Sequence, residues 1–273
     1  MIKRKTTGSI VCPSCGRLIS VNASECIHCG RKNPGLWGFG PYLQRWLGRA
    51  GVIQALIAAC VIVYLISLLI DLSALLQPRG FLGLLAPSTR ALDRMGMTGR
   101  YALIMGRWWT LVTAIYLHGG VVHILFNMLW LRQLGTMVEE LFGRSRTWLI
   151  FTLSGISGFF FSDLFGIMFT VGASGSIFGL LGALIFYGRR RGGYFGSAIY
   201  RQVGTWAIVL FLFGFFMPAV NNIAHAGGFA GGYLAARILG FQEFRLESVR
   251  HRRLATATFL VTIVCFALAV VLH

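Results

Sequence analysis

One uncharged run limits what this chain can fold into. Residues 51–70 contain no Asp, Glu, Lys or Arg and are almost entirely apolar. An α-helix of about 20 apolar residues is long enough to cross the ~30 Å hydrocarbon core of a bilayer. Across the whole chain 12% of the residues are charged, whereas soluble domains carry about 25%. We therefore expect an integral membrane protein.

Further apolar segments predict an all-α polytopic membrane protein with seven spans. The span that begins at Ser174 is the shortest, and we expect its first turn to lie below the membrane surface in a protein-lined cavity. The connection 72–107 is mostly apolar, which favours an ordered insertion resting partly in the membrane over an exposed loop. The other spans are 119–138, 147–169, 174–187, 203–217, 223–239 and 254–272.

The net charge of +17 does not indicate a nucleic-acid partner. No lysine follows Lys32, and most of the arginines gather in alternate connections between spans, as expected of cytoplasmic loops. We therefore expect these positive charges to interact with the lipid bilayer. The pattern predicts a multi-pass protein of the cell membrane with a cytoplasmic N-terminus.

The N-terminal segment carries two C-x2-C pairs separated by ten residues. Four thiolates at such a spacing can surround a structural Zn²⁺ ion tetrahedrally, which predicts a zinc ribbon. A redox dithiol pair or two disulfides are alternatives, although a cytoplasmic N-terminus disfavours disulfides. We expect His28 to be a bystander and the ribbon to bind a cytoplasmic partner. The expected ligands are Cys12, Cys15, Cys26 and Cys29.

Two glycine stripes predict a close contact between helices. Gly172, Gly175, Gly179 and Gly182 recur three or four residues apart around Ser174. Glycine costs a helix about 1 kcal/mol relative to alanine, a cost accepted in membranes where helices must approach closely. A second stripe, Gly228 and Gly232, follows His225 at three and seven residues. We expect the stripes to pack together, although Ser174 alone could be an incidental packing serine.

Polar residues in three spans indicate a nucleophilic site. His225 can remove the hydroxyl proton of Ser174, which then attacks a carbonyl carbon. His123 and Asn127 share one helix face, and polar groups are expensive to bury in a membrane unless they are functional or paired. Together with the backbone N–H of Ser174 they are suitable donors to an oxyanion. His118 is the weakest candidate, and we expect it to be structural.

Residues that are missing from the spans exclude other catalytic mechanisms. The spans contain no lysine for a Ser–Lys pair, and H-E-x-x-H is absent, so we expect no cofactor for catalysis. Asp163 is the only acid placed to orient His225, and a capping or solvent-exposed role is the simpler interpretation.

These motifs resemble those of rhomboid intramembrane serine proteases. The resemblance rests on His123-Ile-Leu-Phe-Asn127, on Gly172-Ala173-Ser174-Gly175, and on Ala224-His225 with Gly228 and Gly232. It implies a six-helix core, a Ser174–His225 dyad, and oxyanion donors at His123 and Asn127. It also implies membrane-protein substrates with helix-weakening transmembrane segments, cleaved near the outer side of the membrane at a site open to the outside.

One departure concerns the first loop, where members of the family often have Trp-Arg. Here the matching place reads Trp108-Trp109-Thr110, which puts the packing of the loop in question. A catalytically silent client-binding relative and, less favoured, a transporter are the alternative functions. The expected parts are a cytoplasmic zinc ribbon (1–35), an interfacial linker (36–50), the rhomboid-like catalytic domain (51–240), a basic cytoplasmic loop (241–253) and an additional transmembrane helix (254–273).

Overall fold

The structure, a computed structural model, describes residues 5–12, 17–39, 51–76, 80–81, 83–217, 220–243 and 247–272. The chain divides into two compact units, Met1–Gly51 and Val52–His273. Residues 40–50, most of the expected interfacial linker, lie outside the described residues.

The small N-terminal unit is built on a two-stranded antiparallel sheet. Strands β1 (Ser9–Val11) and β2 (Leu18–Ser20) pair with Ile10 opposite Ile19. These two isoleucines are buried together with Val21, Cys12 and Cys26, while the alternate strand positions are exposed. A short helix, η1 (Leu36–Gly38), follows. Such a small apolar core indicates a unit that needs additional stabilisation.

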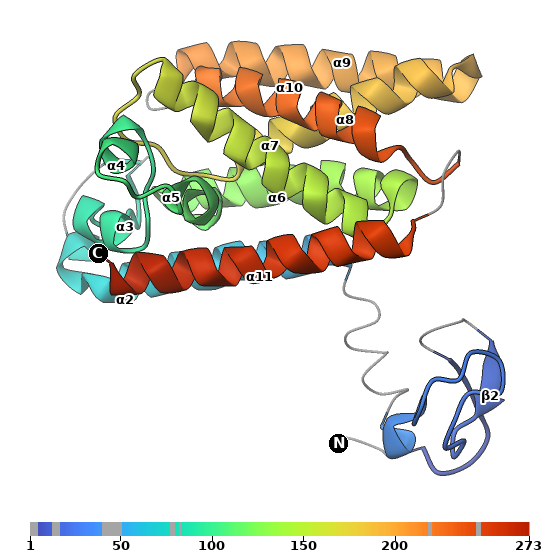
Figure 1. Ribbon diagram of the computed structural model, residues 1–273. Helices are drawn as coiled ribbons and strands as arrows, with labels where there is room; N and C mark the ends of the chain where they lie inside the picture. Colours follow the sequence, from blue (N-terminus) through green and yellow to red (C-terminus); the bar gives the residue numbers. More distant parts are fainter. Residues whose placement is uncertain are drawn as a thin grey trace. The chain divides into compact units, whose positions relative to one another are not determined.

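The larger unit is a bundle of long helices that run side by side (Figure 1). By length and composition, five helices in the described part of the chain can cross a membrane: α2, α6, α7, α9 and α11. The other two expected spans, 174–187 and 223–239, correspond to α8 and α10, of 18 residues each, which are not among these five. The bounds are α2 Val52–Ile70, α6 Val121–Phe142, α7 Arg144–Leu164, α8 Ser174–Arg191, α9 Gly193–Phe216, α10 Asn222–Leu239 and α11 Val249–Val271. The expected all-α polytopic architecture is confirmed.

Several helix ends differ from the expected spans. Helix α9 begins at Gly193 instead of 203, and α8 continues to Arg191 instead of ending at 187. Hydropathy marks the apolar part of a helix, whereas the backbone hydrogen bonds continue through polar end turns. Helix α7 ends at Leu164 instead of 169, because Gly166 adopts a φ of +80° and the Ile167 N–H turns back to the Ser162 carbonyl.

The connection between α2 and α6 is an ordered insertion of short helices. Arg107 forms an ion pair with Asp93 at 2.7 Å, and the Thr110 hydroxyl donates to the Arg107 carbonyl at 2.7 Å. Thr110 Oγ1 also lies 3.0 Å from Thr98 Oγ1. Thr110 therefore holds the loop through neutral hydrogen bonds, with the charged contact supplied by Arg107. The short helices are η2 Leu72–Leu76, α3 Thr89–Arg94, α4 Arg100–Ile104, α5 Thr110–Thr113 and η3 Ala114–Tyr116.

This insertion also holds the segment that leads into α8. Thr98 and Thr170 exchange backbone hydrogen bonds of 3.3 and 2.8 Å. Two residues later, the Gly172 N–H donates to the Ala114 carbonyl at 2.9 Å. The entry to α8 is thus fixed by backbone contacts with a region far away in the sequence.

Helix α8 is buried along most of its length and packs closely against α7 and α10. A Cβ added to Gly228 would meet the Gly175 carbonyl, and one added to Gly232 would meet the Gly179 carbonyl. The two predicted glycine stripes therefore face each other, backbone against backbone. Helix α7 is a third partner, since a Cβ on Gly158 would lie 2.6 Å from the Ala224 carbonyl oxygen.

Two glutamates accept hydrogen bonds from helix starts that lie elsewhere in the sequence. Glu139, near the end of α6, accepts from the first two N–H groups of α2, those of Val52 and Ile53, at 3.2 and 3.3 Å. Glu247, before α11, accepts from the Ser145 N–H at the start of α7 at 2.6 Å. Helix starts leave such N–H groups without acceptors inside the helix. The two carboxylates accept hydrogen bonds from these N–H groups, and their negative charge interacts favourably with the positive end of the helix dipole.

Candidate active site

Ser174 is the first residue of α8, and its side chain is partly buried. It follows Gly172, whose φ of +127° is rarely adopted by other residues, and the buried Ala173. In the first turn of a helix the backbone N–H groups have no acceptor inside the helix. The Ser174 hydroxyl therefore stands at a helix start whose N–H groups and dipole favour negative charge.

His123 lies against this helix start. A Cβ added to Gly172 would be 2.8 Å from both Cε1 and Nε2 of His123 and 4.0 Å from the Ser174 nitrogen. The Gly119 N–H donates to His123 Nδ1 at 3.3 Å. Because Nδ1 is an acceptor, the proton of the neutral ring belongs on Nε2, which faces Gly172. His123 can thus act as a donor beside Ser174.

Asn127 lies one helical turn after His123 and is only 3% exposed. Its Nδ2 donates to the His123 carbonyl at 2.8 Å, which engages one of the two amide protons. Among the described residues, the Asn127 side chain forms no hydrogen bond with Ser174. The other amide proton is available to a bound group.

His225, on α10, is 6% exposed and stacks on Phe178, with ring centroids 4.2 Å apart and an angle of 12° between the ring planes. Phe178 lies four residues after Ser174, on the same face of α8. Ser174 and His225 share no hydrogen bond within the described part of the chain. Catalytic hydrogen bonds are often long without substrate and tighten in the complex.

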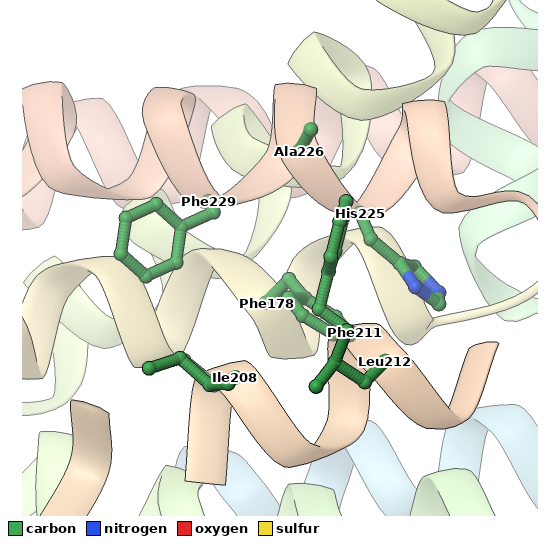
Figure 2. Close-up of a pocket in the computed structure, with 8 residues that line it drawn as sticks. Phe178, Ile208, Phe211, Leu212, His225, Ala226 and Phe229 are labelled. Carbon is green, nitrogen blue, oxygen red and sulfur yellow. The ribbon is translucent and has the colours of Figure 1, made fainter. Parts of the chain in front are cut away.

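The surroundings of His225 are strongly apolar. A cavity of about 340 Å³ lies between α8, α9 and α10 and is lined by His225 and by aromatic and aliphatic side chains. Figure 2 shows His225 beside Phe178, with Phe211 and Leu212 contributed by α9. The side of the imidazole that faces this cavity therefore has apolar neighbours.

A residue that the sequence did not single out contacts His225. Asn222 Oδ1 lies 3.1 Å from His225 Nδ1. The possible orienting acid, Asp163, is partly exposed near the end of α7 and is not the group on that nitrogen. The available signal was the position of Asn222, one helical turn before His225.

His118 is completely buried, and the structure assigns it a supporting place. Its Nδ1 lies 3.2 Å from the Tyr116 carbonyl oxygen, and its ring packs edge-to-face on His123 with centroids 5.2 Å apart. Through this contact His118 limits the rotation of the His123 ring.

The N-terminal unit contains a possible metal site. The sulfur atoms of Cys12, Cys26 and Cys29 lie within 4.8 Å of one another, with 3.8 Å between the sulfurs of Cys12 and Cys29. A tetrahedral zinc site with Zn–S bonds of about 2.3 Å has sulfurs about 3.8 Å apart. Cys15, the fourth expected ligand, lies outside the described residues. His28 is exposed and contacts Arg17 at 3.3 Å.

The two cysteine turns share a backbone pattern. The Cys12 N–H donates to the Arg17 carbonyl at 2.8 Å, and the Cys26 N–H donates to the Arg31 carbonyl at 2.9 Å. In both cases the acceptor lies five residues after the cysteine. The described residues thus fit a metal held between two similar turns.

Comparison with known proteins identifies the family. A family model described as Rhomboid domain matches residues 105–242, just over half of the chain. The chain belongs to the rhomboid family. The matched region of this rhomboid contains His123, Asn127, Ser174 and His225, whereas the N-terminal unit and α11 lie outside it.

Curated relatives of this rhomboid come from bacteria and plants. It is 36% identical to Rhomboid protease GluP of Bacillus subtilis (strain 168) over 180 residues, covering 64% of this chain and 34% of the relative. RHOMBOID-like protein 4 of Arabidopsis thaliana is 38% identical over 57% of this chain and 40% of the relative. RHOMBOID-like protein 5 of the same plant is 36% identical, with corresponding shares of 57% and 52%. The matched region spans about half or less of these relatives.

Proposed function

We propose that this chain is an intramembrane serine endopeptidase in which Ser174 is the nucleophile and His225 the general base. The observation that carries the proposal is the backbone contact between Gly175 and Gly228. Gly175 directly follows Ser174, and Gly228 lies one turn after His225. Their contact brings the helix that carries the base close to the helix that carries the nucleophile. The name of the relative GluP, a rhomboid protease, supports the same activity.

Formation of the acyl-enzyme needs two proton transfers, and its hydrolysis needs two more. His225 accepts the Ser174 hydroxyl proton while Oγ attacks the peptide carbonyl, and the imidazolium then gives that proton to the leaving amine. A water molecule then gives a proton to the same imidazole and attacks the acyl carbon, and the imidazolium returns that proton to Ser174 Oγ as the acid product leaves. Each step returns the histidine to its neutral form.

The negative charge of the tetrahedral intermediate would be held by fixed donors. His123 Nε2 and the Ser174 backbone nitrogen both lie near the position that a Cβ of Gly172 would occupy. The second amide proton of Asn127 is the third proposed donor. Loss of one such donor typically reduces the rate by about 10²–10³. The close packing of Gly175 with Gly228 and of Gly179 with Gly232 supports the arrangement without contacting substrate.

We propose membrane proteins with helix-weakening transmembrane segments as substrates, cleaved near the outer side of the membrane. The arginine distribution supports a cytoplasmic N-terminus. The proposed catalytic domain covers 51–240, followed by the basic loop 241–253 and the helix 254–273. The ribbon, 1–35, would hold structural zinc through Cys12, Cys26, Cys29 and Cys15 and recruit a cytoplasmic partner.

A Gly172→Ala variant is expected to cleave substrate up to ~10²-fold more slowly, because the new methyl group would displace the oxyanion donor His123. Gly166→Ala is the matched control. Both glycines have positive φ, but a Cβ at 166 meets no atom within 4 Å. Equal losses of cleavage in the two variants, measured per folded molecule, would contradict the role of His123.

Covalent labelling separates an active protease from a catalytically silent client-binding relative. A fluorophosphonate is expected to label the intact chain on Ser174, as identified by mass spectrometry of the modified peptide. Activation by His225 is required, so His225→Ala should remain unlabelled although Ser174 is present. Failure of the folded wild-type chain to react would favour the silent relative.

A further inference from the structure

We propose that Asn222 is the positioning residue of His225, holding the ring in the tautomer whose Nε2 can accept the Ser174 proton. This inference rests on the proposed function and adds a third residue to it. Asn222 would replace the carboxylate that orients the histidine in Ser-His-Asp sites.

The contact itself selects a tautomer. Asn222 Oδ1 is only an acceptor, so the 3.1 Å contact with His225 Nδ1 requires a proton on Nδ1. A neutral imidazole carries one proton, which leaves Nε2 with a lone pair. The opposite tautomer would place the proton on Nε2, where the ring could not act as a base toward Ser174 through that atom.

The position of the carboxamide is enforced by α9. A Cβ added to Gly214 would fall on Asn222 Oδ1 and lie 3.0 Å from its Cγ. A glycine at 214 therefore lets α9 close over the Asn222 side chain. Phe178 restrains the plane of the imidazole from its face, and Asn222 restrains its rotation from its edge.

The neighbouring asparagine has a different task. Asn221 Oδ1 accepts the Ala224 N–H at 3.0 Å and so caps α10, while its Nδ2 donates to Ser162 and Thr170. Asn222 is thus not required for capping. The two adjacent asparagines provide a comparison of the same residue type in a structural and in a positioning role.

The test measures the rate at which a fluorophosphonate labels Ser174 in the purified full chain. Asn222→Leu, of similar size but without an acceptor, is expected to slow labelling about 10–100-fold, by analogy with the loss of groups that orient metal-binding histidines. Asn222→Asp keeps the acceptor and is expected to restore most of the rate. A merely structural role would not distinguish the two variants at equal melting temperature.

Two further variants sharpen the result. Gly214→Ala is expected to displace the carboxamide and slow labelling, and the double variant with Asn222→Leu should be no slower than Asn222→Leu alone, because both act through one contact. Asn221→Ala should lower the melting temperature but leave the labelling rate of folded molecules near that of the wild type. If the double variant were labelled more slowly than Asn222→Leu, by the product of the two single effects, the two residues would not act through one contact.

The ring can also be observed directly. In the wild-type chain containing ¹⁵N-histidine, with His225→Gln used for assignment, we expect the His225 proton on Nδ1. A proton on Nε2, wild-type labelling in Asn222→Leu, or Asn222→Asp as slow as Asn222→Leu would each overturn the inference. A wild-type chain that resists labelling but has Nδ1 protonated would overturn the proposed protease function alone.

Discussion

A Ser174→Ala variant is expected to lose cleavage of a co-expressed single-span membrane substrate by roughly 10⁴-fold or more, since no covalent route remains without the nucleophile. The change should not disturb the fold, because alanine is a better helix former than serine. The measurement is the appearance of the cleaved substrate fragment on immunoblots.

Ser176 offers a matched control on the same helix. It is fully buried, and its hydroxyl has no hydrogen-bond partner within the described residues. Ser176→Ala should therefore cleave at nearly the wild-type rate. Cleavage by Ser174→Ala at the wild-type rate would rule out the mechanism. A proteomic comparison of wild type with Ser174→Ala would then identify substrates as membrane proteins that accumulate uncut.

Removal of zinc is expected to unfold the N-terminal unit. Its apolar core consists of a few side chains around Ile10 and Ile19, whereas zinc binding supplies about 10–16 kcal/mol of apparent folding energy in zinc-finger peptides at pH 7. We expect one zinc per chain in the wild type and loss of that zinc in Cys12→Ser. Rapid amide exchange throughout residues 5–39 should accompany the loss.

Cys265→Ser is the control for this experiment, because Cys265 is buried in α11 and is not one of the three clustered cysteines. It should retain its zinc. Metal-free wild-type chain with protected amides, or cysteines oxidised to disulfides, would contradict a structural zinc site. Cleavage by a chain that lacks 1–35 would show that the ribbon recruits or regulates and does not take part in the chemistry.

The sequence was informative where one segment alone carries the physical signal. Transfer of an apolar run into lipid depends on that run, so the spans could be predicted, with errors at polar ends such as Arg191. The glycine stripes were equally local, and their spacing predicted the contact of Gly175 with Gly228. The candidate site residues were inferred from polar groups in three spans taken together, because each motif alone was ambiguous, and the family resemblance implied the same residues.

Other features depend on pairs of distant residues and could not be predicted from local patterns. The backbone pairing of Thr98 with Thr170 leaves no side-chain signature, because both partners use only N–H and C=O groups. The contact of Gly158 with the Ala224 carbonyl requires knowledge of how α7 crosses α10. Asn222 was equally inconspicuous beside the capping Asn221, because its function depends on the direction of one side chain.

The glutamate contacts at the helix starts have a consequence for biosynthesis. The acceptor for the first N–H groups of α2 lies 87 residues later in the chain, and the acceptor at the start of α7 lies 102 residues later. A ribosome therefore finishes each of these helices well before it makes the carboxylate that completes its first turn. Helix α2 can therefore insert into the membrane before its first turn has its final hydrogen-bond acceptor. In a nascent chain truncated before Glu139, the first N–H groups of α2 would still be bound to water at the membrane surface.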